Sequence, residues 1–274
     1  MTTLTTHVGK VLCLSFLVIP SSLVEGKVIS PLYSTHVNSN KFVVNKRASA
    51  LKAAVDRRAL AARAAAQRRA EVRMISLEAV GLSAELQLAD SGLDQKVLEY
   101  ALMGYHRLQR RGMLHNMDLL SICDFSKPSS ERRMYIIDVR NRRLLYRTYV
   151  AHGEGSGSEY ASDFSNTPES HKSSLGFYVT RDSYYGGNGL SLRMEGLDKG
   201  FNSMALERAI VIHGAPYVSE RILHKYGVMG TTFGCPAIPE DLSGQIIPLL
   251  KNGSCFFIYA PSARYLLRSS VLNG

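Results

Sequence analysis

The chain has 274 residues, of which 45% are hydrophobic and 20% charged, a globular balance that allows a core of ordinary size. No run approaches the roughly 20 apolar residues that a membrane helix needs. The net charge of +10 would normally favour a nucleic-acid partner, but most of that charge lies in one segment.

Residues 1–26 have the pattern of a secretory signal peptide. Lys10 precedes the apolar run Val11–Ile19, Pro20 ends this run, and small residues up to Gly26 follow. A buried N-terminal strand is the alternative, but a short apolar run behind a basic residue at the N-terminus fits a signal better. We therefore expect export to the periplasm or cell envelope, with no transmembrane helix in the mature chain.

Residues 27–75 are expected to form a basic arm or linker. Residues 27–45 show little periodicity and are interpreted as irregular, whereas 46–73 are rich in Ala and Arg and favour a helix. The second segment holds nine basic residues against two acidic ones, and only +3 remains for the rest of the chain. Without interleaved aromatic residues, and in an exported chain, nucleic-acid binding is not expected. The segment is either a solvated helix or an attachment to anionic envelope polymers or lipid headgroups.

Residues 76–118 are predicted to be a helical region with two helices. Ser91 is a candidate N-cap for the second, and arginines in its last turn suit the helix dipole before Gly112 ends it. Its apolar residues recur at helical spacing and indicate core packing: Leu93, Val97, Leu98, Ala101, Leu102 and Tyr105.

Residues 119–262 are predicted to form a mainly β domain, sandwich- or barrel-like, followed by a C-terminal tail at 263–274. Short runs rich in β-branched and aromatic residues recur there, separated by turn residues. Helical patterns are scarce and occur only at Asn202–Arg208 and Pro239–Lys251.

Three cysteines remain if Cys13 leaves with the signal, so at least one thiol is free. Cys123 and Cys255 lie in apolar, strand-like runs, where they either form a disulfide or stay buried as thiols. Cys235 lies instead in a turn, between a glycine and a proline. No Cys-x-x-Cys pair occurs, which argues against a thiol redox protein.

A nucleophilic cysteine needs a nearby base, because a free thiol is mostly protonated at neutral pH. His213 is the candidate, since it follows the apolar run Ala209–Ile212 at the end of a predicted strand. Gly214 follows it and would leave room for a substrate backbone. A histidine at a strand end is more often structural, so this spacing alone is weak evidence.

The segment IVIHGAPYVSERILHKYGVMGTTFGCPAIP resembles the signature of the murein L,D-transpeptidase catalytic domain family, in a branch with GCPA after the Ser/Thr-x motif. That family pairs a strand ending in His-Gly with a later Ser/Thr-x-Gly-Cys, which Thr232–Cys235 matches. The resemblance runs from about Ile122 to Pro261. Further blocks carry it: Val150–Gly157, Phe164–Asn166, Ser173–Thr180, Gly189–Asn202 and Gly253–Pro261.

The resemblance implies that Cys235 attacks a stem tetrapeptide of peptidoglycan, with His213 taking the thiol proton. A terminal D-alanine leaves, and an amine acceptor then resolves the thioester. Main-chain amides around Phe233–Cys235 would stabilise the oxyanion, with Thr232, Phe233, Gly234 and Gly214 as oxyanion or positioning residues. No metal or cofactor is expected, since no close pair of metal ligands supports one.

Two positions depart from the family pattern. Phe233 stands where many members have a second histidine, so that role cannot be transferred, and Thr231 and Thr232 stand where branch members tend to have Arg-Ser. If that arginine holds a substrate carboxylate, Arg193 or Arg208 is a candidate replacement.

Four further residues lie in or near the matching blocks, and turn or core hydrogen bonding is weighed against substrate contact for each: His152, Ser173, Ser174 and Tyr217. Two other functions stay open. The same site with water as the acceptor would be an L,D-carboxypeptidase. The altered Thr-Thr-Phe run also suggests a non-catalytic envelope-binding protein, although the presence of both Cys235 and His213 argues against it.

Overall fold

The computed structural model describes residues 37–274, so the predicted signal peptide lies outside the described residues. The described chain divides into two compact units within helix α1 (Val37–Glu85). The first holds residues 37–61, which are all helical, and the second, residues 62–274, holds every other element. Within the described part, no helix combines the length and the apolar character required to cross a membrane.

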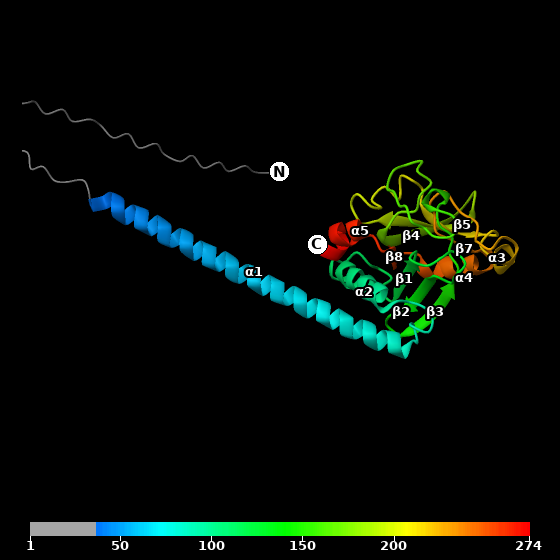
Figure 1. Ribbon diagram of the computed structural model, residues 1–274, viewed down its shortest axis with the longest axis horizontal. Helices are drawn as coiled ribbons and strands as arrows, with labels where there is room; N and C mark the ends of the chain where they lie inside the picture. The colour runs from blue at the N-terminus through cyan, green and yellow to red at the C-terminus, as the bar shows by residue number, and fades with distance from the viewer. Residues whose placement is uncertain (1–36) are drawn as a thin grey trace, which may run out of the picture. The chain divides into compact units, whose positions relative to one another are not determined.

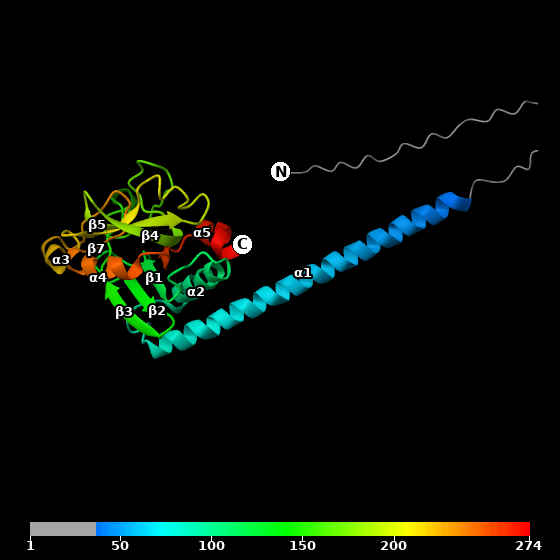
Figure 2. The same ribbon diagram turned by 180° about the vertical axis from the view of Figure 1, so that it is seen from behind.

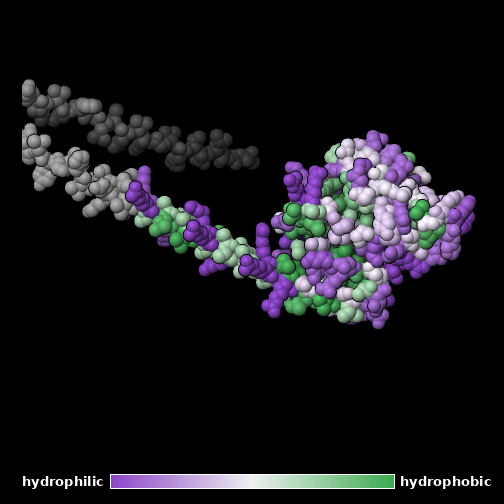
Figure 3. All heavy atoms as spheres, in the orientation of Figure 1, coloured by the Kyte–Doolittle hydropathy of each residue, from purple (hydrophilic) through white to green (hydrophobic). Residues whose placement is uncertain are grey.

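Helix α1 joins segments that the sequence analysis treated separately (Figure 1). The expectation of an irregular segment up to residue 45 is wrong for residues 37–45, which are helical, and the helix continues beyond residue 75. The reason is composition: no Gly or Pro interrupts it before Gly81. Between residues 45 and 73 nearly every side chain is exposed. Figure 3 shows hydrophilic residues, in purple, recurring along this helix.

Helix α2 (Gln95–Arg110) is found where it was predicted, but Ser91 does not cap it. The cap is Asp94, whose Oδ1 accepts hydrogen bonds from the main-chain N–H groups of Lys96 at 2.7 Å and Val97 at 3.4 Å. Its apolar face is buried, as the helical spacing predicted. The helix therefore serves the core.

Eight strands form one sheet in the order β3-β2-β1-β8-β4-β5-β6-β7, which confirms the predicted mainly β class. The pairs β1–β8 and β6–β7 are parallel and the others are antiparallel. The central strands β1 and β8 are buried along their whole length. The strands span Leu119–Asp124 (β1), Met134–Asp138 (β2), Arg143–Thr148 (β3), Gly176–Gly186 (β4), Gly189–Gly196 (β5), Val211–Ala215 (β6), Ala237–Pro239 (β7) and Cys255–Tyr259 (β8).

The chain beyond edge strand β3 returns to the opposite edge of the sheet. Ala151 forms an antiparallel bridge with Ala237 of β7, and Gly153 forms a parallel bridge with Thr232. These contacts bring the two edges together, so the sheet approaches a closed barrel and its edges are covered. They also place residues 151–154 against the turn that carries Cys235.

The helices of the β-rich half differ in part from the sequence prediction. Helix α4 (Glu240–Leu250) was predicted and contacts β5, β6 and β7, whereas Asn202–Arg208 forms turns instead of a helix. The short helix α3 (Glu220–Tyr226) was not predicted. A single 3-10 turn, η1 (Glu154–Ser156), follows β3.

The segment expected as a C-terminal tail forms two short helices, α5 (Ala263–Arg268) and α6 (Ser270–Asn273). Helix α6 contacts α2, and the C-terminal helices lie beside α2 in both views (Figures 1 and 2). Asp198, which is fully buried, fastens this end of the chain. Its carboxylate accepts hydrogen bonds from Tyr265 Oη at 2.9 Å, Ser269 Oγ at 2.5 Å and Val271 N at 3.1 Å.

Candidate active site

Cys235 lies in a turn that is held together by Thr232. Thr232 Oγ1 accepts a hydrogen bond from Gly234 N at 3.0 Å and donates one to Cys235 O at 2.7 Å. Gly234 has a φ of +118°, and a Cβ there would lie 2.8 Å from Lys172 O. Both the conformation and the close approach therefore require glycine before the cysteine.

The turn places the Cys235 thiol beside strand β6. His213 of β6 is in register with Ala237 of β7, so the residue two positions before Ala237 comes level with Val211. Accordingly, Val211 N donates to Cys235 Sγ at 3.4 Å, and Sγ donates to Ala209 O at 3.7 Å. His213 follows two residues along the same strand, about 7 Å of backbone further on. Within residues 37–274 no hydrogen bond joins the two side chains.

The His213 ring is held in one tautomer. Nδ1 lies 3.0 Å from the carbonyl oxygen of Gly214, and because a carbonyl only accepts, Nδ1 carries the proton. In the neutral ring Nε2 therefore holds the lone pair. The side chain is only 4% exposed, and this burial lowers the pKa of His213 more than the bond to Gly214 raises it. The ring is thus a neutral base at pH 7.

Burial raises the pKa of the Cys235 thiol, and the bond from Val211 N and the charge of Arg208 oppose that rise only in part. The lowered pKa of His213 and the raised pKa of Cys235 have the same consequence. Both favour a neutral thiol and a neutral imidazole over a thiolate–imidazolium ion pair. Such a thiol becomes a nucleophile only when a base removes its proton.

Arg208 fastens the loop of residues 165–174 to this turn. Its Nη1 donates to Ser165 O at 2.8 Å and its Nη2 donates to Lys172 O at 2.6 Å. The same two nitrogens also donate to hydroxyl groups, Nη1 to Ser174 Oγ and Nη2 to Ser170 Oγ. The guanidinium is therefore engaged by the protein itself, which leaves it a positioning role in place of the suggested carboxylate anchor.

Arg193, the other suggested anchor, forms an ion pair with Asp182 and stacks over Tyr184, 4.0 Å from the ring centroid. These contacts lie at the β4–β5 hairpin. Like Arg208, this arginine is already occupied by partners within the protein.

The buried residues His152, Ser173 and Ser174 make hydrogen bonds within the protein. His152 Nδ1 accepts from Arg133 Nη2 at 2.7 Å, so its Nε2 donates to Gly157 O at 3.0 Å. Burial lowers the pKa of His152 to about 4. Ser173 Oγ donates to Gly234 O at 3.3 Å, and Ser174 Oγ donates to Ser165 O at 2.7 Å.

Tyr217 is the predicted contact residue that lies near the thiol. It is half-buried and packs against the chain at Gly230. Burial, and secondarily the charge that Cys235 would carry, raise the pKa of Tyr217. Tyr217 therefore lies beside the Cys235 turn and packs against the segment that leads into it.

The space beside Gly214 is filled by helix α4, because a Cβ there would lie 2.8 Å from Ser243 Cβ and 3.1 Å from Glu240 Cα. The expectation that this glycine leaves room for a substrate backbone is therefore replaced by a packing role. His213 precedes it and, because side chains alternate along a strand, points to the opposite face.

Phe233 is 69% exposed and stacks on His171, with ring centroids 4.2 Å apart. His171 Nδ1 lies 2.7 Å from Glu154 Oε1. No local pattern singled out His171, because Glu154 and Phe233, which it contacts, come from segments far apart in the chain. The side chains of Phe233, His171 and Glu154 therefore contact one another along one side of the Cys235 turn.

Candidate oxyanion donors are fewer than expected, because Gly234 N–H is bound to Thr232 Oγ1. Within the described chain, the main-chain N–H groups of Phe233 and Cys235 have no protein acceptor. These two amides are therefore the ones free to bind an oxygen of a substrate.

A cavity of about 700 Å³ lies elsewhere, between residues 160–167, Phe201 and residues 260–264. Neither Cys235 nor His213 lines it, so this cavity is separate from the Cys235 turn. No three histidine, cysteine, aspartate or glutamate side chains gather as a metal site requires, in the part of the chain that the structure describes. Cys123 and Cys255 are buried free thiols.

Fold and site together define a near-barrel β domain with a cysteine turn held against a histidine-bearing strand. The family model described as "L,D-transpeptidase catalytic domain" matches residues 89–259, more than half of the chain, so the match includes α2 as well as the sheet. The chain belongs to this family, as the sequence resemblance predicted. Among curated proteins, none matches its sequence.

Two solved structures are similar in part. An L,D-transpeptidase from Mycobacterium smegmatis has 11% identity and a TM-score of 0.32, over 52% of this chain and 59% of that one. An L,D-transpeptidase from Xylanimonas cellulosilytica has 13% identity and a TM-score of 0.30, over 52% and 60%. The chain thus spans less than two thirds of either. At this level the likeness adds nothing to the family assignment.

Proposed function

We propose that the chain is a peptidoglycan L,D-transpeptidase with Cys235 as nucleophile and His213 as base. The main support is the register of β6 and β7, which brings the Cys235 thiol within hydrogen-bonding distance of Val211 N. His213 lies two residues further along the same strand, as a neutral ring whose Nε2 holds the lone pair. In the proposed reaction His213 Nε2 takes the thiol proton as Sγ attacks the carbonyl carbon of the third stem residue.

The free amides of Phe233 and Cys235 would stabilise the oxyanion of the tetrahedral intermediate. As the intermediate collapses, the peptide C–N bond breaks, the departing D-alanine takes the proton back from His213, and a thioester remains on Cys235. An acceptor amine then attacks this thioester, forms the new amide bond and releases the thiol. No metal or cofactor has a part in this scheme.

The test is an analysis of products from stem tetrapeptide dimers, using the wild type and Cys235→Ala. Loss of D-alanine with a new direct cross-link between third residues, absent in the variant, is the expected result. Tripeptide alone would identify an L,D-carboxypeptidase. Unchanged substrate with a folded protein would favour a non-catalytic envelope-binding protein, whose motivation is the Thr231-Thr232-Phe233 run.

We further propose that the chain acts in the periplasm or cell envelope, as the signal-like residues 1–26 suggest, and that the catalytic domain centres on residues 119–262. Residues 46–73 are the proposed attachment to anionic envelope polymers or lipid headgroups. The support is their exposure and their excess of seven positive charges. Loss of envelope binding after deletion of residues 46–61 would test it.

A further inference from the structure

Four arginines of the second compact unit line one small cavity between α1 and α2. Arg68 comes from α1, and Arg107, Arg110 and Arg111 come from the end of α2. The cavity has a volume of about 190 Å³, and Glu71 and Gly274 complete its lining. Cations at the end of α2 suit its dipole, but this does not explain why α1 adds an arginine to the same cavity.

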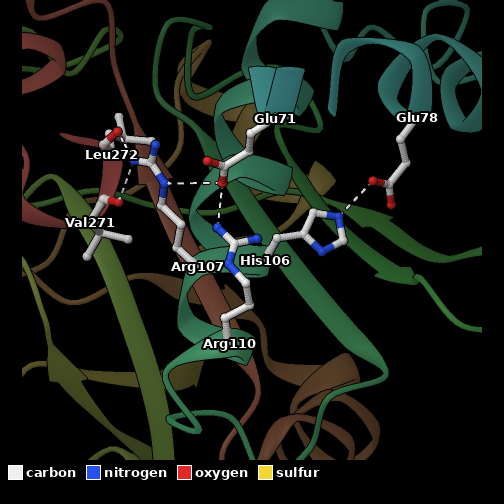
Figure 4. Close-up of polar contacts among 7 residues, drawn as sticks. All are labelled: Glu71, Glu78, His106, Arg107, Arg110, Val271 and Leu272. Carbon is white, nitrogen blue, oxygen red and sulfur yellow. Dashed lines mark hydrogen bonds and ion pairs between the residues drawn. The ribbon is translucent and has the colours of Figure 1, made fainter. Parts of the chain in front are cut away.

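The positive charges of this arginine cluster are only partly balanced. Glu71 Oε1 lies 3.7 Å from Arg107 Nε and also pairs with Arg110 (Figure 4). Among the described residues no other ion pair reaches the cluster, so Arg68 and Arg111 have no carboxylate partner. Among the side chains that line the cavity, four arginines against one glutamate leave three positive charges in excess.

Arg107 lies deepest in the cluster, with a side chain that is 11% exposed. It donates to the carbonyl oxygens of Val271, at 3.1 Å, and Leu272, which fix its position (Figure 4). Burial lowers the pKa of Arg107, and the neighbouring arginines lower it further against the opposing effect of Glu71. The repulsion among these cations would be relieved by a bound anion.

We propose that the arginine cluster of Arg68, Arg107, Arg110 and Arg111 binds a phosphate group. Guanidinium groups match the oxygens of a phosphate with paired, charge-assisted hydrogen bonds. The cavity has room for a small oxyanion but is below the usual size of about 300–1,000 Å³ for larger ligands. This excess of positive side-chain charge suits a dianion. The site is independent of the chemistry proposed at Cys235.

The first experiment measures the thermal unfolding midpoint of the full chain in inorganic phosphate and in chloride at matched ionic strength. Phosphate at about ten times its Kd is expected to raise the midpoint by about 2–4 °C. The variant Arg68→Gln/Arg111→Gln should lose this shift. The matched control, Arg63→Gln/Arg268→Gln, likewise removes one arginine of residues 46–73 and one from elsewhere, both exposed and outside the cavity, and should keep it. Arg111→Gln alone serves if the double variant does not fold.

A second experiment separates the sources of phosphate. Sedimentation with phosphatidylcholine vesicles, with and without phosphatidylglycerol, compares the same two double variants. Weaker binding of the cluster variant than of the control would assign the site to a lipid headgroup. Equal vesicle binding, with a phosphate shift only in the control, would assign it to a soluble phosphorylated ligand. An equal phosphate shift in both double variants, or none in the wild type, would overturn the proposal.

Discussion

Replacing Arg208 by methionine removes the cation that joins residues 165–174 to the Cys235 turn. Its two bonds to main-chain oxygens, to Ser165 at 2.8 Å and Lys172 at 2.6 Å, involve a charged donor, for which about 1.5 kcal/mol is the low end of the usual contribution. Arg208 is only partly buried, so the low figure applies to each bond. We therefore expect the free energy of unfolding to fall by about 3 kcal/mol, measured by urea denaturation.

The same substitution should raise the pKa of Cys235, because the nearby guanidinium favours the thiolate. Less thiolate at a given pH means slower alkylation by iodoacetamide. Cys123 and Cys255 are fully buried, so in a Cys13→Ser background the alkylation rate reports on Cys235.

The control is Arg208→Lys, which keeps the charge but loses the planar fork. It should retain most of the alkylation rate while losing part of the stability. If the methionine variant lost neither, or if lysine slowed alkylation as much as methionine, then Arg208 would not couple this loop to Cys235.

Three more predictions concern stability, each measured by urea unfolding. Ala209 has a φ of +51°, so Ala209→Gly should stabilise by about 1 kcal/mol, and a loss of stability would show that the backbone is not strained there. Asp198→Ala leaves several buried donors without an acceptor and should lower the free energy of unfolding by more than about 4 kcal/mol. A loss below about 1 kcal/mol would rule out Asp198 as the anchor of α5 and α6. The bond to Glu78 raises the pKa of His106. The His106–Glu78 bond therefore contributes about 0.5–1 kcal/mol to the free energy of unfolding at pH values below about 6.5, the pKa of histidine in the unfolded chain. This contribution is lost as the pH rises through the higher pKa that His106 has in the folded protein. A stability difference between wild type and His106→Gln that did not shrink with rising pH would contradict this.

The sequence was sufficient for features that depend on local pattern. Apolar runs predicted the buried strands β1 and β8, and apolar residues at the 3.6-residue spacing predicted helix α2. The N-cap was missed because Ser91 and Asp94 are both good caps, and the choice between them depends on where the chain turns.

Features made by contacts between distant segments were not predictable from one sequence. The bridge between Ala151 and Ala237, which closes the sheet, joins residues that share no local pattern. The stacking of His171 on Phe233 and the positive φ of Ala209 are likewise set by packing. At the site, the resemblance singled out Cys235 and His213, but only the register of β6 and β7 gives their relative placement.

The most direct test of the central proposal is the intact mass of the protein after brief incubation with a stem tetrapeptide and no acceptor amine. The account predicts a mass increase equal to the tripeptide acyl group, abolished by Cys235→Ala and mapped to Cys235 by digestion. His213→Ala, which retains the thiol but lacks the base, should acylate much more slowly. An adduct that persists without Cys235, or no adduct with a folded wild type that binds the peptide, would contradict it.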